Sequence, residues 1–256
     1  MANQDGNDPN GPTYVEHYGK RFSDDWGQIT FEWSGYEWSI HGPRGAPQAE
    51  HPETGERQWV NGVEVRDNGD LALRSEGIDG GVEILTVPSL GYGVYTFIYS
   101  ADFNAMHPSN VLGVFTYDWI EFNHGGGYSE IDFIEISRWN APHLELPHAS
   151  VTYYPDDLEV ARPGTGIIPS AFEIPAGHQT LTTRAEWRNG YLRVVTSTAD
   201  GQVLSDTEST SRIPRDNAQQ VHINIWTSQQ EDKEGYQGFS TARGDEIIFH
   251  SFSYEE

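Results

Sequence analysis

Three carboxylates alternate with apolar residues in one short stretch of the chain, Tyr-Ser-Glu-Ile-Asp-Phe-Ile-Glu-Ile-Ser-Arg-Trp. They are Glu130, Asp132 and Glu135. Acidic residues that alternate with β-branched and aromatic ones predict a β-strand, in which residues two apart share a face. Glu130 and Asp132 therefore point the same way. Glu135 joins them only if a β-bulge near Phe133 or Ile134 adds one residue to the strand.

Crowded carboxylates repel one another, so at least one of the three should have a raised pKa. Such a set can split a glycosidic bond, because an ionised carboxylate attacks the anomeric carbon while a protonated neighbour donates to the leaving oxygen. Carboxyl groups about two strand positions apart suit the roughly 5–5.5 Å separation of a retaining mechanism. A solvated acidic strand face has the same spacing, and spacing alone does not exclude it.

Residues 130–135, Glu-Ile-Asp-Phe-Ile-Glu, resemble the signature of family 16 glycoside hydrolases, in the version with one inserted bulge residue. The resemblance implies that Glu130 is the nucleophile, Glu135 the acid/base, and Asp132 the residue that tunes their protonation. It implies a retaining endo-glycosidase for a β-linked polysaccharide, with a β-1,3 or mixed-linkage β-1,3-1,4 glucan as the preferred substrate. Algal galactans of the agar and carrageenan type stay open, because enzymes that act on them share the bulge variant.

Two further positions come from the same resemblance. Gly-Gly-Val-Glu-Ile-Leu at residues 80–85 is similar to a strand of the lichenase branch, which implies that Glu83 contacts substrate. Leu85 stands where that branch has an arginine, so the sugar contacts there differ from the family pattern. Tyr128 stands two residues before Glu130, where family members often carry an aromatic side chain that touches sugar. A solvent-facing Glu83 fits the strand equally well.

Residues 221–226, Val-His-Ile-Asn-Ile-Trp, are similar to the family's Asn-Leu-Trp strand beside the catalytic one. Strict alternation puts His222, Asn224 and Trp226 on one face. The resemblance implies that Asn224 and Trp226 bind sugar, and Trp139 at the end of the acidic stretch is a further predicted substrate contact. Tryptophan is commonly buried, so a core position for Trp226 is the alternative.

The whole chain reads as an all-β protein. Its 256 residues fit one large β domain, and aromatic residues, glycine and proline are plentiful while long helical periodicity is missing. We expect a flexible N-terminal arm at 1–22 and a single catalytic domain at 23–256. The expected domain is a concanavalin A-like jelly roll, a β-sandwich of two curved antiparallel sheets with the substrate cleft on the concave sheet.

The formal net charge is −24, from 39 acidic and 15 basic residues, and Lys20 and Lys233 are the only lysines. This excess of negative charge argues against nucleic acid and anionic membranes as partners, so the expected partner is a polysaccharide. Dispersed acidic residues with few lysines indicate a salt-adapted, halophilic surface, and an ordinary acidic secreted enzyme is the alternative. We expect an extracellular monomer, although no signal peptide is visible in the sequence.

No residue set in the sequence secures a metal site, so metal ligands are unknown and no cofactor is expected to be required. A structural calcium on the far face is compatible with the many carboxylates. However, His250 or Phe249 stands where many relatives have the aspartate that holds it. Two other functions are alternatives. A non-catalytic carbohydrate-binding sandwich has no need of three crowded carboxylates. A polysaccharide lyase is disfavoured because the chain has no basic cluster for an anionic substrate.

Overall fold

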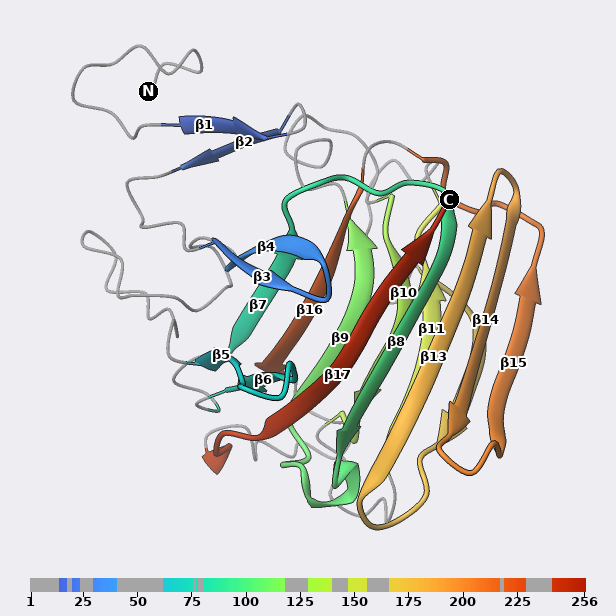
Figure 1. Cartoon of the computed structure of the whole chain (residues 1–256). Helices are drawn as coiled ribbons and strands as arrows, with labels where there is room; N and C mark the ends of the chain where they lie inside the picture. The colour runs from blue at the N-terminus through green and yellow to red at the C-terminus, as the bar shows by residue number, and fades with distance from the viewer. Residues whose placement is uncertain are drawn as a thin grey trace.

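The computed structural model shows an all-β protein (Figure 1). It describes residues 14–17, 20–23, 30–40, 62–75, 77, 81–117, 129–139, 147–155, 166–216, 219–228 and 241–256. A short 3-10 helix spans Phe103–Ala105. No helix within the described residues is long and apolar enough to cross a membrane.

One sheet has eight antiparallel strands in the order β12-β11-β10-β9-β16-β7-β4-β3. Its strands are β3 (Thr30–Trp33), β4 (Tyr36–Ile40), β7 (Val82–Thr86), β9 (Asn110–Tyr117), β10 (Ile131–Ser137), β11 (His148–Tyr153), β12 (Ile167–Glu173) and β16 (Gln220–Thr227). The acidic stretch is thus an interior strand, with β9 and β11 on its two sides.

The second sheet has seven antiparallel strands in the order β15-β14-β13-β8-β17-β6-β5. Its strands are β5 (Val63–Val65), β6 (Leu71–Arg74), β8 (Gly93–Ala101), β13 (Gln179–Arg188), β14 (Tyr191–Thr198), β15 (Val203–Ser209) and β17 (Glu246–Glu255). Near the N-terminus, β1 (Tyr14–His17) and β2 (Lys20–Ser23) pair with each other in a separate two-stranded sheet, which lies in the predicted arm at 1–22 except for Ser23. The predicted sandwich of antiparallel sheets is confirmed.

Aromatic residues join the two sheets. Phe133 of β10 lies against Tyr95 and Phe97 of β8, with ring centroids 5.1 and 6.2 Å apart. Trp33 and Trp38, whose orientation the sequence leaves open, are both buried in this core. Removing a large apolar side chain from water stabilises a fold by about 1.5–3 kcal/mol, so this layer holds the acidic strand firmly in place.

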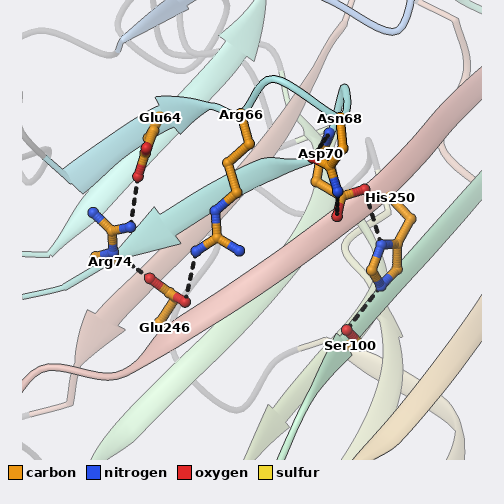
Figure 2. A network of polar contacts seen from close by, with 8 residues as sticks. All are labelled: Glu64, Arg66, Asn68, Asp70, Arg74, Ser100, Glu246 and His250. Carbon is orange, nitrogen blue, oxygen red and sulfur yellow. Dashed lines mark hydrogen bonds and ion pairs between the residues drawn. The ribbon is translucent and has the colours of Figure 1, made fainter.

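On the seven-stranded sheet, a polar network joins the turn between β5 and β6 to the closing strand β17 (Figure 2). The His250 ring lies between Asp70 and Ser100, with Nδ1 3.0 Å from Asp70 Oδ1 and Nε2 2.8 Å from Ser100 Oγ. Asn68 adds a hydrogen bond from Nδ2 to Asp70 Oδ2 at 2.8 Å. Burial raises the pKa of Asp70, but the hydrogen bonds from His250 and Asn68 outweigh it and hold that pKa below its usual value.

The same network bears on the expected calcium. Phe249, one of the two residues that align with the relatives' aspartate, is buried in the core, and His250 is bound to Asp70 and Ser100. Within the described residues no group of three or more histidine, aspartate or glutamate side chains could hold a metal ion. The arginines and glutamates beside this network form exposed ion pairs, which contribute little to stability.

Candidate active site

The register of β10 contains one extra residue. Against β9, Asp132 and Ile134 pair with the consecutive residues Phe115 and Val114, so Phe133 is the additional residue. The pairing of β10 with β11 shifts at the same place. The predicted β-bulge near Phe133 or Ile134 is therefore confirmed, and it resets the alternation of the strand.

The bulge sorts the side chains of β10 between two faces. Phe133 and Ile134 are both fully buried and belong to the core between the sheets. Glu130, Asp132 and Glu135 instead act on one another electrostatically, which shows that their carboxyl groups lie together. Alternation about the bulge places all three on the outer face of the eight-stranded sheet. The predicted substrate cleft would lie on this face.

The backbone of Ser129 and Glu130, just before β10, is held by contacts with other segments. Ser129 has a positive φ of 44°, a conformation that a non-glycine residue keeps only when its surroundings enforce it. Gln219 Nε2 donates to the Ser129 carbonyl at 3.2 Å, and the Tyr154 N–H donates to the Glu130 carbonyl at 2.9 Å. These contacts fix the backbone of Glu130 from two neighbouring segments.

The carboxyl groups share their protons. Burial raises the pKa of Glu130 to about 8, that of Glu135 to about 7, and that of Asp132 well above its usual range. The trio therefore carries fewer than three negative charges at neutral pH. The hydrogen bond between Asp132 and Glu130 lowers the pKa of Glu130 and raises that of Asp132. This hydrogen bond thus opposes the effect of burial on Glu130 and adds to it on Asp132.

One row of residues crosses four neighbouring strands at the level of Glu135. Glu135 lies opposite Gly113 on β9, and Gly113 lies opposite Asn224 on β16. Asn224 in turn lies opposite Glu83 on β7. The buried Oδ1 of Asn224 has no hydrogen-bond partner in the part of the chain that the structure describes. An unsatisfied acceptor of this kind can take a hydrogen bond from a ligand.

Glu83 is bound to a histidine that the sequence does not mark as a site residue. His222 Nδ1 lies 2.6 Å from Glu83 Oε1, and the histidine side chain is fully buried. Alternation had put His222 on the face of Asn224 and Trp226. Nothing in the sequence indicates that His222 contacts Glu83, because the two residues are 139 positions apart along the chain.

Two predicted aromatic contacts lie together. The rings of Trp139 and Trp226 are 6.4 Å apart between centroids and meet edge to face at 70°. Trp139 is 37 % exposed and Trp226 is half-buried, so neither belongs to the core. Trp139 has a positive φ of 48°, and its N–H donates to Ser137 Oγ at 2.9 Å. Trp139 and Trp226 thus form a partly exposed aromatic pair beyond the end of β10.

The structure brings together most of the predicted site. The carboxylates of β10 share one face with the row that contains Glu83 and Asn224, and Trp226 extends that face along β16. Tyr128 lies outside the described residues. The roles of Glu83, Asn224, Trp226 and Tyr128 in substrate binding stay predictions.

No family model and no curated protein matches the sequence. Solved structures do match the fold. The laminarinase catalytic domain of Thermotoga maritima aligns over 85 % of this chain and 90 % of its own, with 12 % identity and a TM-score of 0.55. A non-specific endo-β-1,3(4)-glucanase of family GH16 aligns over 85 % and 84 %, with 14 % identity and a TM-score of 0.51.

A third structure is an immunostimulatory antigen and pseudo-β-1,3-glucanase of Mycobacterium tuberculosis. It aligns over 86 % of this chain and 91 % of its own, with 14 % identity and a TM-score of 0.54. The predicted resemblance to family 16 is thus confirmed at the level of the fold, a jelly roll shared with glycoside hydrolases. Because a fold hosts different activities, function has to be argued from the site.

Proposed function

We propose that this protein is a retaining endo-glycoside hydrolase that cleaves a β-linked polysaccharide. The observation that carries the proposal is the bulge at Phe133, which gathers Glu130, Asp132 and Glu135 on one face. A retaining glycosidase needs one ionised and one protonated carboxyl group on either side of the scissile bond. The raised pKa values keep part of the trio protonated, and the hydrogen bond with Asp132, which lowers the pKa of Glu130, favours ionisation of the proposed nucleophile.

The proposed reaction has two displacements. Glu130 attacks the anomeric carbon while Glu135 donates its proton to the leaving glycosidic oxygen, so a covalent glycosyl-enzyme forms and the leaving sugar departs. Glu135 then takes a proton from water, whose oxygen attacks the same carbon and releases Glu130. Asp132 supports both steps by donating its hydrogen bond to Glu130. Two inversions leave the anomeric configuration unchanged.

The preferred substrate is a β-1,3 or mixed-linkage β-1,3-1,4 glucan. The aromatic pair of Trp139 and Trp226 supports an uncharged sugar as the substrate, because an aromatic face packs against the C–H groups of a pyranose ring. The net charge of −24 disfavours sulfated galactans by repulsion, which concentrated salt would screen. The similarity in fold to a laminarinase and to an endo-β-1,3(4)-glucanase points in the same direction.

A reducing-end assay on laminarin, lichenan, agarose and carrageenan, at low and high salt, tests the proposal. We expect hydrolysis of a glucan by the wild type and a loss of at least about a thousandfold in Glu130→Gln, because that variant has no nucleophile. A 2-fluoro-glycoside should label Glu130 by mass spectrometry. Near-normal turnover in Glu130→Gln would refute the mechanism. Binding without product release would identify a carbohydrate-binding sandwich.

A further inference from the structure

The contact between His222 and Glu83 has the geometry of a positioning interaction. The Nδ1–Oε1 distance of 2.6 Å is short for a nitrogen–oxygen hydrogen bond, as expected when one partner is charged. An ionised carboxylate can only accept, so Nδ1 carries the proton and donates it. Glu83 keeps 13 % of its side chain exposed while His222 has none exposed. The glutamate therefore reaches the surface and the histidine supports it from beneath.

Packing locks the orientation of the His222 ring. It is stacked on Phe115, with centroids 4.9 Å apart and planes 23° apart, and Tyr117 meets it edge-on at 5.9 Å. Phe115 lies opposite His222 on one side and opposite Asp132 on the other. The His222 ring thus lies on the same face of the sheet as the carboxylates. Phe115 on β9 lies between His222 on β16 and Asp132 on β10.

Glu83 also acts on the reacting groups. Its negative charge is one of the influences that raise the pKa of Glu130, after burial and together with Glu135. A displacement of the Glu83 carboxylate would therefore change the field at Glu130. This coupling joins β7 to β10 across the two strands that lie between them.

We infer that His222 is a positioning residue, which holds the Glu83 carboxylate toward bound sugar by donating a hydrogen bond from Nδ1. The inference rests on the proposed glycosidase function and adds to it a residue that acts through Glu83. The negative charges of Glu83 and Glu130 repel each other, and a hydrogen bond from His222 opposes that repulsion. The ligand groups it serves are the hydroxyl groups of a neutral sugar.

Two substitutions separate this role from packing. His222→Phe keeps a flat ring against Phe115 but removes the donor, whereas His222→Asn places an amide N–H near the position of Nδ1. We expect His222→Phe to lower kcat/KM by about tenfold to hundredfold, mainly through KM, as for loss of a hydrogen bond to a charged group. His222→Asn should recover most of that loss. Equal loss in both variants would show a packing role only and would overturn the inference.

A double-mutant cycle with Glu83→Leu, which removes the acceptor oxygens, gives the second test. If His222 acts through Glu83, His222→Phe should lower kcat/KM by less than about threefold once Glu83 is already replaced. The pH profile of kcat/KM should shift in both single variants by similar amounts. His250→Phe, on the opposite sheet, is the matched control and should leave kcat/KM and its pH profile unchanged. Additive losses in the cycle would contradict the inference.

The hydrogen bond can be observed without substrate. In protein with ¹⁵N-labelled histidine, the Nδ1–H of His222 should give a protected downfield proton signal that disappears in Glu83→Leu, which has no acceptor oxygen. If the wild type hydrolyses sugar and Glu130→Gln does not, normal kinetics in His222→Phe refutes the inference alone. If no polysaccharide is cleaved, the proposed function fails and positioning for catalysis fails with it. If the Nδ1–H signal of His222 is nevertheless observed, the hydrogen bond to Glu83 has a structural role only.

Discussion

Asn224 Oδ1 lies 2.6 Å from the point that a Cβ on Gly113 would occupy. The missing side chain therefore leaves room for the amide oxygen above β9. Gly113 is also opposite Glu135, so the space beside the proposed acid/base is occupied by an acceptor from β16. The glycine is required here for close approach rather than for backbone freedom.

Gly113→Ala should push the Asn224 side chain away while the fold survives. We expect kcat/KM to fall by about tenfold or more, because a one-ångström displacement of a positioning group is costly in an active site. Asn224→Ala removes the clash, so adding Gly113→Ala to that variant should cost little further activity. Kinetics of the four proteins and their melting temperatures check this. An unchanged Gly113→Ala enzyme would show that the amide has no role.

The bulge predicts opposite outcomes for two changes in length. Inserting one alanine between Ile134 and Glu135 turns Glu135 toward the core, where an unpaired charge is strongly unfavourable, so activity and stability should both collapse. Deleting Ile134 restores plain alternation and keeps Glu135 on the outer face, at the cost of about 2–5 kcal/mol of core packing. The deletion variant should therefore stay folded and keep measurable activity. Similar behaviour of both variants in urea unfolding and hydrolysis would refute this role of the bulge.

Glu135 should make the protein less stable as pH rises. Its pKa is about 7 in the folded protein and 4.5 in the reference state, so between these values the folded protein holds a proton that the unfolded chain has released. Stability falls through this window. The free energy of unfolding of Glu135→Gln should thus exceed that of the wild type by on the order of 2 kcal/mol at pH 8. The difference should be much smaller at pH 5. Urea unfolding checks this, with the exposed Glu32→Gln as control.

Asp70 should show the opposite dependence. Hydrogen bonds lower its pKa in the folded protein, so the stability it contributes is present above the reference value of 3.8 and is lost as pH falls. Asp70→Asn should cost about 1 kcal/mol at pH 7, and the difference from wild type should shrink at pH 3. Hydrolysis of polysaccharide should be unaffected, because the network lies on the other sheet (Figure 2). A constant difference across pH would contradict this account.

Trp139→Ala should raise KM about two- to tenfold with a smaller change in kcat, as expected for the loss of one stacked ring. Oligosaccharide binding to Glu130→Gln should change tryptophan fluorescence less when Trp139 is also replaced. Val203→Ala removes another exposed apolar side chain, on β15 of the opposite sheet, and should leave KM unchanged. An unaltered KM in Trp139→Ala would remove this residue from the substrate contacts.

Local patterns in the sequence were sufficient for much of the acidic strand. The five-residue step from Glu130 to Glu135 is odd, so a shared face required one extra residue, and the structure has it at Phe133. Asp-Asn-Gly at residues 67–69 is likewise typical of a hairpin turn, and it lies between the paired strands β5 and β6, with Gly69 at a φ of 87°. These features depend on neighbours in the chain, which is why they are readable from it.

The sequence by itself determined which face each side chain takes within its own strand and how many negative charges the molecule carries. Only the tertiary structure decided that Trp33 and Trp38 pack in the core, and that His222 contacts Glu83. The physical reason is that periodicity is local, whereas strand order and register come from packing two sheets against each other. Residues 139 positions apart meet only after that packing has set β16 beside β7.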